Sequence, residues 1–235
     1  MFNSIREYLK YRGLNKNRTK LGLFLSNFCG IDKDIVGRQI AEGLQHYIFE
    51  YGEDKVLKVP KLDLPNLIYG MLNPKDVESD WKLINQYFRK YTVETRIYAS
   101  KDNELYCVIQ KKIRNKLNIN SHNIDLVLKQ FNDIYLRNKK LEFLTGYSLD
   151  LWGKSGILRS IKKSIIKSNI FIEMTNLIIE QDELKNYRIK IIDTNLFKVE
   201  ISFGYWVRIF TDKIIYMLSD FVLKRAKFIS RDFNA

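Results

Sequence analysis

The sequence is poor in cysteine, histidine and proline, and these shortages exclude several classes of protein. It has 2 cysteines, 2 histidines and 3 prolines among 235 residues. Cys29 and Cys107 lie far apart, and His46 and His122 show no ligand spacing, so neither a disulfide framework nor a zinc site is predicted. Buried thiols are expected at both cysteines instead. With 46% hydrophobic residues, the chain is neither disordered nor fibrous.

Long apolar runs are missing as well. No run approaches the roughly 20 residues that span a bilayer, and LGLFLSNF near the N-terminus is too short. The N-terminus also lacks the continuous apolar core of a signal peptide. We therefore expect a cytoplasmic protein without a transmembrane segment, long enough for one large lobe or two small ones.

Basic residues outnumber acidic residues in this chain. The chain has 40 Lys and Arg against 27 Asp and Glu, a formal net charge of +13, and much of the excess falls between Lys111 and Lys167. Such a surface attracts polyanions: a nucleotide, a nucleic acid, an anionic lipid surface or an acidic protein. A solvated face that keeps the protein soluble explains scattered lysines equally well. No zinc-ligand, RNA-binding-sheet or helix-turn-helix motif supports the nucleic-acid interpretation beyond charge.

What the sequence does contain is a series of short strands with glycines and a lysine. HYIFEYGEDKVLKVP alternates apolar and polar residues around a turn at 52–54, which predicts two antiparallel strands. IVGRQIAEGLQ predicts a strand before them that carries Gly37 and Gly43. Glycines near the first turn allow backbone N–H groups to lie over a polyphosphate. Lys58, on the third strand, is placed to reach the same oxygens.

Helices and hairpins alternate after this lysine. Apolar periodicity predicts helices over 73–91 and 123–144, the second ending at Thr145-Gly146. TRIYAS and ELYCVIQKKI predict one hairpin, and TNLIIEQDELKNYRIKIID predicts another. Asp150 follows the long helix, and Asp193 closes the last hairpin. A further helix is predicted over 205–229.

This order resembles the protein-kinase-like superfamily, which includes aminoglycoside phosphotransferase-like enzymes. The resemblance implies an α+β, two-lobed fold. After an N-terminal extension (1–30), an N-lobe with an antiparallel sheet and a helix would occupy 31–113. A reduced, mostly helical C-lobe would occupy 114–235, too short for a full substrate-binding lobe, so the acceptor site would be reduced or completed by a partner.

The resemblance also assigns roles in nucleotide binding. Gly37, Gly43 and Lys58 would bind the phosphates of ATP. Glu78 would pair with Lys58, with Glu94 as a weaker candidate. The backbone at 110–112 would bind adenine.

The later motifs would supply metal binding and catalysis. Asn176 and Asp193 would bind Mg²⁺, which prefers hard oxygen ligands and keeps several waters. Asp150 would accept the proton of the acceptor hydroxyl. Lys58, Asn176 and Asp193 are then expected to meet around one triphosphate in a groove between the lobes.

The chain departs from the family pattern next to both aspartates. Ser148 and Leu149 replace the usual histidine or arginine before Asp150, and Ser155 stands where an asparagine is expected. Thr194-Asn195 replaces the Phe-Gly that follows the metal-binding aspartate. We interpret the irregularity as an insertion at 157–172, a basic amphipathic segment. It suits an ordinary core-facing helix or a helix that docks on a membrane surface or a substrate.

Three functions remain compatible with these observations. The first is ATP- and Mg²⁺-dependent phosphoryl transfer to a hydroxyl of an unidentified acceptor, a protein or a small molecule. The second is a pseudokinase, a nucleotide-binding or scaffolding module without activity. The third is a basic nucleic-acid-binding protein in which the strand motifs are coincidental.

Overall fold

The computed structural model describes residues 29–43, 45–61, 73–100, 105–113, 124–151, 171–173, 176–182, 184–199 and 227–229. They form two compact units. The first contains the described residues up to Trp81 together with Val93–Lys112, and the second contains Lys82–Thr92 and the described residues from Ile113 on. The predicted N-terminal extension lies outside the described residues except for 29 and 30.

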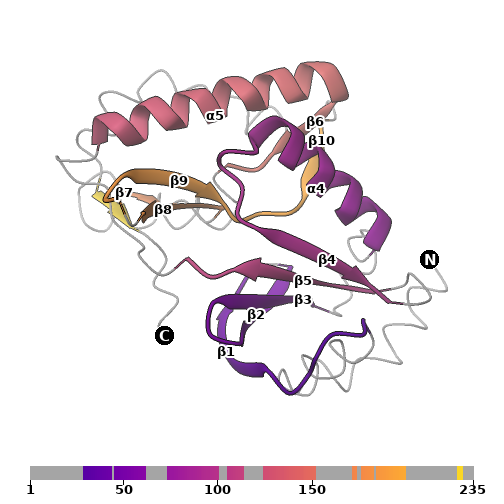
Figure 1. Cartoon of the computed structure of the whole chain (residues 1–235). Coiled ribbons are helices and arrows are strands. Elements are labelled where there is room, and N and C mark those ends of the chain that lie inside the picture. The colour runs from indigo at the N-terminus through magenta and orange to yellow at the C-terminus, as the bar shows by residue number, and fades with distance from the viewer. Residues whose placement is uncertain are drawn as a thin grey trace. The chain divides into compact units, whose positions relative to one another are not determined.

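The first unit contains a five-stranded antiparallel sheet (Figure 1). Its strands are β1 (Val36–Glu42), β2 (His46–Tyr51), β3 (Lys55–Pro60), β4 (Thr95–Ala99) and β5 (Tyr106–Lys111). Their order across the sheet is β1-β2-β3-β5-β4. The two predicted hairpins are confirmed, and the first turns at Gly52, which has a φ of 62°.

Helix α4 (Pro74–Phe88) confirms the predicted helix over 73–91, three residues shorter at its C-terminal end. Asn73 caps it, because its Oδ1 accepts the backbone N–H of Lys75 at 3.1 Å, and Pro74 occupies the first helical position. In the first unit, Val77 of α4 packs on Tyr106 and Val108 of the sheet. One face of the sheet is therefore the α4 face.

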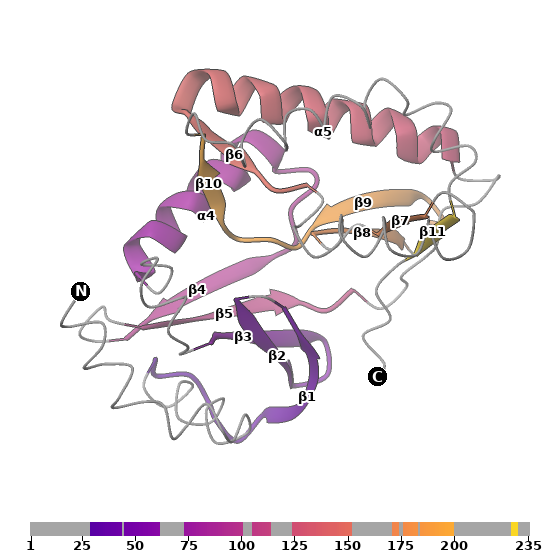
Figure 2. The ribbon, with the colours of Figure 1, turned by 180° about the vertical axis from the view of Figure 1, so that it is seen from behind.

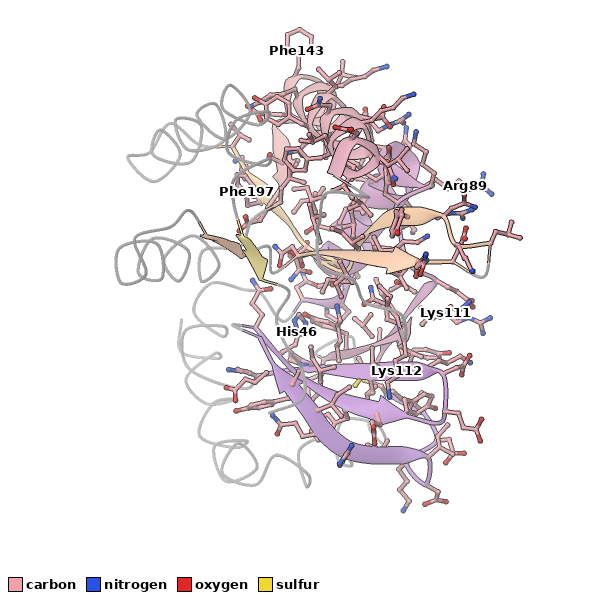
Figure 3. All side chains as sticks on the ribbon, turned by 90° about the vertical axis from the view of Figure 1, so that its left-hand side faces the viewer. His46, Arg89, Lys111, Lys112, Phe143 and Phe197 are labelled. Carbon is pink, nitrogen blue, oxygen red and sulfur yellow. The ribbon has the colours of Figure 1, made fainter. Side chains whose placement is uncertain are left out.

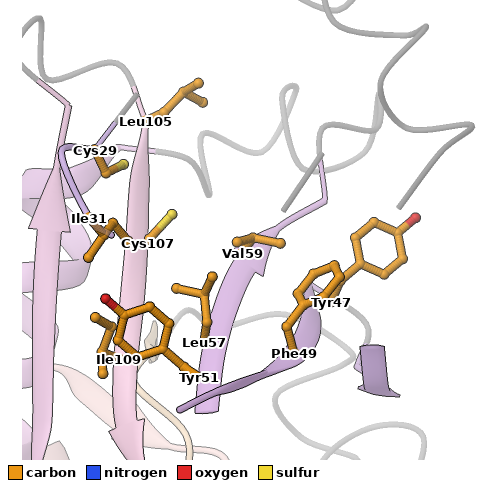
Figure 4. Close-up of a cluster of buried hydrophobic side chains, with 10 residues drawn as sticks. All are labelled: Cys29, Ile31, Tyr47, Phe49, Tyr51, Leu57, Val59, Leu105, Cys107 and Ile109. Carbon is orange, nitrogen blue, oxygen red and sulfur yellow. The ribbon is translucent and has the colours of Figure 1, made fainter. Parts of the chain in front are cut away.

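The opposite face of the sheet holds a hydrophobic cluster of ten buried residues (Figure 4). Strand alternation explains its composition, since Phe49, Leu57 and Ile109 are direct cross-strand neighbours. Cys29 and Cys107 are free thiols in this cluster, as predicted. Burial and a hydrogen bond with Cys29 raise the pKa of the Cys107 thiol well above its usual value.

The second unit combines one long helix with short strand pairs (Figure 2). Its elements are α5 (Ile124–Thr145), β6 (Tyr147–Leu149), β7 (Phe171–Glu173), β8 (Leu177–Gln181), β9 (Tyr187–Ile191), β10 (Leu196–Lys198) and β11 (Lys227–Ile229). β6 pairs with β10 and β8 with β9, both antiparallel, while β7 and β11 are parallel. The predicted long helix and the hairpin after it are confirmed.

Two predictions for the second unit differ from the structure. Lys227–Ile229 forms strand β11, so the helix predicted over 205–229 does not include these three residues, and the rest of it lies outside the described residues. The predicted insertion at 157–172 also lies outside them, apart from the start of β7. In its described part the second unit is a mixture of helix and strand, not mostly helical. The α+β class is confirmed.

Helix α5 packs along the β8–β9 hairpin through a glutamine that bonds to backbone. The Nε2 of Gln130 donates to the carbonyl of Tyr187 at 2.7 Å, and its Oε1 accepts the N–H of Ile189 at 3.0 Å. The helix ends at Gly146, whose φ of 71° lets its N–H reach the carbonyl of Glu142. Phe143 in the last turn points away from the unit and is 88% exposed (Figure 3).

A charged network joins α5 to the chain that follows α4. Oδ2 of Asp133 accepts hydrogen bonds from Tyr91 Oη at 2.7 Å and Arg137 Nε at 2.9 Å, and lies 2.8 Å from Lys90 Nζ. Burial alone would raise the pKa of Asp133, but the three donors outweigh it and hold this pKa well below its usual range. Asp133 is therefore a structural carboxylate.

Among the described residues, no helix combines the length and the hydropathy that a membrane-spanning segment requires.

Candidate functional site

Four strand ends converge in the second unit. The end of β6 pairs with the start of β10 through Leu149 and Leu196, and the start of β8 pairs with the end of β9 through Leu177 and Ile191. Antiparallel pairing brings the end of one strand beside the start of the next. Loop residues next to these ends can therefore contact one another.

Asn176 makes these contacts. Its Nδ2 donates to Oδ2 of Asp193 at 3.0 Å and to the backbone carbonyl of Asp150 at 2.5 Å. Its own carbonyl accepts the N–H of Ile192 at 3.0 Å, which continues the β8–β9 ladder. The structure thus brings together Asp150, Asn176 and Asp193, which are separated by 26 and 17 positions along the chain.

Backbone donors hold the other oxygen of Asp193. Its Oδ1 accepts the N–H groups of Thr194 at 2.8 Å and Asn195 at 3.3 Å. Hydrogen bonds to an ionised carboxylate are stronger than those between neutral groups. The backbone of Thr194-Asn195 therefore orients the Asp193 carboxylate.

Asp193 and Asn176 present the donor types that Mg²⁺ prefers. A carboxylate and an amide oxygen are both hard ligands, and an amide can hold a neighbour with its NH₂ group while its oxygen accepts a cation. Among the described residues, no cluster of three or more His, Cys, Asp or Glu side chains could hold a metal unaided. This donor set fits a cation that takes its remaining ligands from phosphate and water.

Asp150 lies directly after β6, between two buried leucines. Leu149 and Leu151 are each 2% exposed, while Asp150 is half-buried. Its backbone is bonded through Asn176, so its side chain is not needed for that contact. A carboxylate on a loop fixed by its main chain can act as a proton acceptor.

The first unit contains Lys58, which is 8% exposed. The β-sheet register places it opposite Ile48 and Val108, and Val108 packs against α4, so Lys58 lies on the α4 face. Glu78 follows Val77 on α4 and is exposed. Glu94 is exposed as well, 3.8 Å from Arg96. The Lys58–Glu78 pair remains a prediction.

His46, labelled in Figure 3, is buried and lies two residues before Ile48 on β2, so the register places it on the same sheet face as Lys58. Its Nε2 lies 2.8 Å from the hydroxyl of Tyr106. Burial first, and then the charges of Lys58 and Lys61, lower the pKa of His46 to about 3. His46 is therefore a neutral structural residue, and the positive field of Lys58 acts on this face.

His46 is expected to make the protein less stable in mild acid. Its pKa is lowered from the ordinary value near 6.5, so at lower pH the unfolded chain binds a proton that the folded chain excludes. Stability is then full above about pH 6.5 and falls as the pH decreases towards about 3. His46→Gln, which does not titrate but can still bond to Tyr106, should lose less stability than wild type between pH 7 and pH 5 in urea unfolding. Parallel losses in the two proteins would contradict the assignment.

The two predicted phosphate-binding glycines lie at opposite ends of β1. Gly43 lies at the turn into β2, where its N–H donates to the carbonyl of His46 at 2.8 Å. Gly37 lies near the β2–β3 turn instead, and a Cβ there would come within 3.0 Å of the Cβ of Glu50. Close packing against β2 explains this glycine. Only Gly43 borders the predicted phosphate loop.

The predicted adenine-binding segment uses its backbone donors internally. The N–H of Lys111 donates to the carbonyl of Glu94 at 2.9 Å, and the N–H of Lys112 donates to the carbonyl of Asp54 at 2.7 Å. Gln110 is buried and donates to Thr95 Oγ1. An adenine contact through either lysine N–H would require one of these backbone bonds to break.

Sequence reasoning missed Asn138 on α5. This side chain is 2% exposed and makes hydrogen bonds to Ser148 and Leu149, the two residues before Asp150. The available signal was a polar residue on the apolar stripe of a helix, at helical spacing from Phe131, Ile134 and Leu141. A buried amide in that position requires hydrogen-bond partners.

No family model and no curated protein matches this sequence. Among solved structures, the chain is similar to one described as the Legionella pneumophila Lpg2603 kinase bound to IP6. The identity is 19% and the TM-score 0.46; the match covers 82% of this chain and 60% of that chain. The chain therefore spans less than two thirds of the length of this neighbour.

Proposed function

We propose that this chain is a kinase-like phosphotransferase that uses ATP and Mg²⁺ to phosphorylate a hydroxyl of an acceptor. One observation carries the proposal: Asn176 bonds to the carboxylate of Asp193 and to the main chain of Asp150. These are the three residues to which the sequence resemblance assigned metal binding and proton transfer, and they come from separate loops.

Catalysis of phosphoryl transfer depends more on positioning the reactants and on stabilising charge than on covalent participation of the protein. Phosphoryl transfer passes through a loose transition state with charge spread over the non-bridging oxygens. Bound Mg²⁺ would neutralise part of that charge, and Asn176 and Asp193 are the residues that would hold it. Asp150 orients the acceptor hydroxyl and takes its proton.

Lys58 and Gly43 are the candidate phosphate-binding groups of the first unit. Lys58 offers an ammonium group on the α4 face, where its charge is, after burial, the second cause of the lowered pKa of His46. Gly43 borders the β1–β2 turn; its own N–H donates to the carbonyl of His46, so its proposed role is to let a phosphate approach the backbone of this turn. Glu78 is the proposed partner that orients Lys58.

A pseudokinase is the second candidate, and one observation favours it. Ser148 is buried and accepts a hydrogen bond from Asn138 at the position where the family has a histidine or arginine. A serine fixed in this way supplies structure but no charge next to Asp150. A nucleotide-binding module without transfer activity could keep the contact between Asn176 and Asp193.

A thermal-shift titration with ATP, with and without MgCl₂, tests the proposal. Ligand at about 100 times its Kd should stabilise the folded chain by about 2.7 kcal/mol. Lys58→Met should weaken this stabilisation, while Lys55→Met, an exposed lysine on the same strand, should leave it unchanged. Stabilisation without ATP turnover would favour the pseudokinase. No stabilisation by ATP with Mg²⁺ would overturn both.

A further inference from the structure

We propose that Asn138 is a positioning residue that fixes the main chain before Asp150, an inference that rests on the proposed function. Asn138 lies on α5, 12 positions before Asp150 in the sequence. Its hydrogen bonds go to Ser148 and Leu149, the two residues before Asp150. Its action on Asp150 would be exerted through the backbone.

The amide of Asn138 bonds to both polar groups of one residue. Its Oδ1 accepts the N–H of Leu149 at 2.8 Å, and its Nδ2 donates to the carbonyl of Leu149 at 3.2 Å. The same Nδ2 lies 3.1 Å from Oγ of Ser148. A side-chain amide that donates to and accepts from a single residue reproduces the hydrogen-bond pattern of a neighbouring strand.

This pattern explains how β6 can be ordered although it has only three residues. On one edge it pairs with β10, where Leu196 lies opposite Leu149. Since the N–H and carbonyl of Leu149 both point to Asn138, the amide covers the other edge at this residue. Very short strands have little stability of their own, so the amide sets the direction in which the chain leaves β6.

A second amide fixes the next peptide group. Asn138 holds the carbonyl of Leu149, and Asn176 holds the carbonyl of Asp150. The two consecutive carbonyls are therefore tied to two different parts of the second unit, α5 and the start of β8. This leaves little freedom in the backbone dihedrals of Asp150, so the direction of its side chain depends on both amides.

Gln130, on the same helix, provides a control for the positioning role of Asn138. Gln130 also uses a side-chain amide to accept an N–H and donate to a carbonyl, in its case Ile189 and Tyr187 of β9. Removing either amide leaves backbone groups without their partners, at a greater cost in stability for the buried bonds of Asn138 than for the part-buried bonds of Gln130. Only Asn138 acts on the peptide groups next to Asp150.

The test compares Asn138→Leu with Gln130→Leu in steady-state ATP hydrolysis with Mg·ATP, where water is the acceptor. Asn138→Leu should lower kcat by about 10²-fold, the effect of misplacing a reacting group by about 1 Å. Its KM for ATP should stay within about twofold, because a positioning defect affects the transition state and not nucleotide binding. Gln130→Leu should also lose stability in urea unfolding but keep a nearly wild-type kcat.

Two further variants keep the positioning role testable if Asn138→Leu does not fold. Asn138→Ser keeps a polar group but cannot reach Leu149, so it should show the same loss of kcat if the leucine variant does not fold. Ser148→Ala removes only the contact with Oγ and should keep kcat within about twofold, because the bonds to Leu149 carry the effect.

The outcomes separate the two proposals. A wild-type kcat in Asn138→Leu or Asn138→Ser, with an active wild-type enzyme, overturns the positioning role and leaves the proposed function standing. Equal losses of kcat in Asn138→Leu and Gln130→Leu also overturn it, because the defect would then be general. A wild-type protein without turnover overturns the proposed phosphotransferase activity, and the positioning role falls with it.

Discussion

Replacing Asp193 by asparagine is expected to remove the Mg²⁺-dependent part of ATP stabilisation and to lower turnover by about 10²-fold or more. The substitution exchanges a charged ligand for a neutral one and so weakens the attraction for a divalent cation. An asparagine oxygen can still accept the N–H groups of Thr194 and Asn195. Its NH₂ group, however, would face the NH₂ group of Asn176, and two donors cannot bond to each other. The readout is the difference between thermal shifts with ATP and MgCl₂ and with ATP and EDTA.

Asp182 offers a matched control on the same hairpin. It lies at the opposite end of the hairpin from Asp193, where its Oδ1 accepts the N–H of Asn186 at 2.8 Å. Hydrogen bonds from Asn186 and the charge of Arg188 lower the pKa of Asp182, so this carboxylate too is fixed by protein donors. Asp182→Asn should leave the Mg²⁺-dependent shift intact. If Asp193→Asn retains the full shift, the metal-ligand assignment is wrong.

The hairpins and helices of this chain were predictable because their signals are local. A period of two residues on both sides of Gly52 gave β2 and β3, and the 3.6-residue period gave α5 and its end at Gly146. The contact between Asn176 and Asp193 follows from the same logic. Two residues that flank the arms of one antiparallel hairpin must lie close together, whatever the rest of the fold is.

Features that depend on distant parts of the chain could not be predicted in the same way. The pairing of β3 with β5 and the parallel pairing of β7 with β11 join segments far apart in the sequence. Lys227–Ile229 continues an apolar helical pattern, yet pairs as a strand. Gly37 was predicted to belong to a phosphate-binding loop. Its close contact with Glu50 depends on the register between β1 and β2, which the sequence does not reveal. Tertiary context overrode local pattern at each of these positions.

Asp150→Ala is expected to lower turnover by about 10²–10⁴-fold, the usual contribution of general-base catalysis, while ATP and Mg²⁺ stabilise the variant as much as wild type. The geometry predicts this separation. Asn176 bonds to the backbone carbonyl of residue 150, and Asn138 bonds to the backbone of Leu149, so alanine preserves both contacts. Only the carboxylate is lost, and with it the acceptor for the hydroxyl proton.

Measuring both quantities on one preparation makes this prediction specific. Initial rates of ATP hydrolysis and autophosphorylation give turnover, and the thermal shift gives binding. Asp125→Ala, an exposed carboxylate in the first turn of α5, should change neither. A loss of stabilisation in Asp150→Ala would instead make Asp150 part of the nucleotide or metal site. Equal turnover in Asp150→Ala and wild type would remove Asp150 as the base, because a proton acceptor cannot be deleted without slowing the step that needs it.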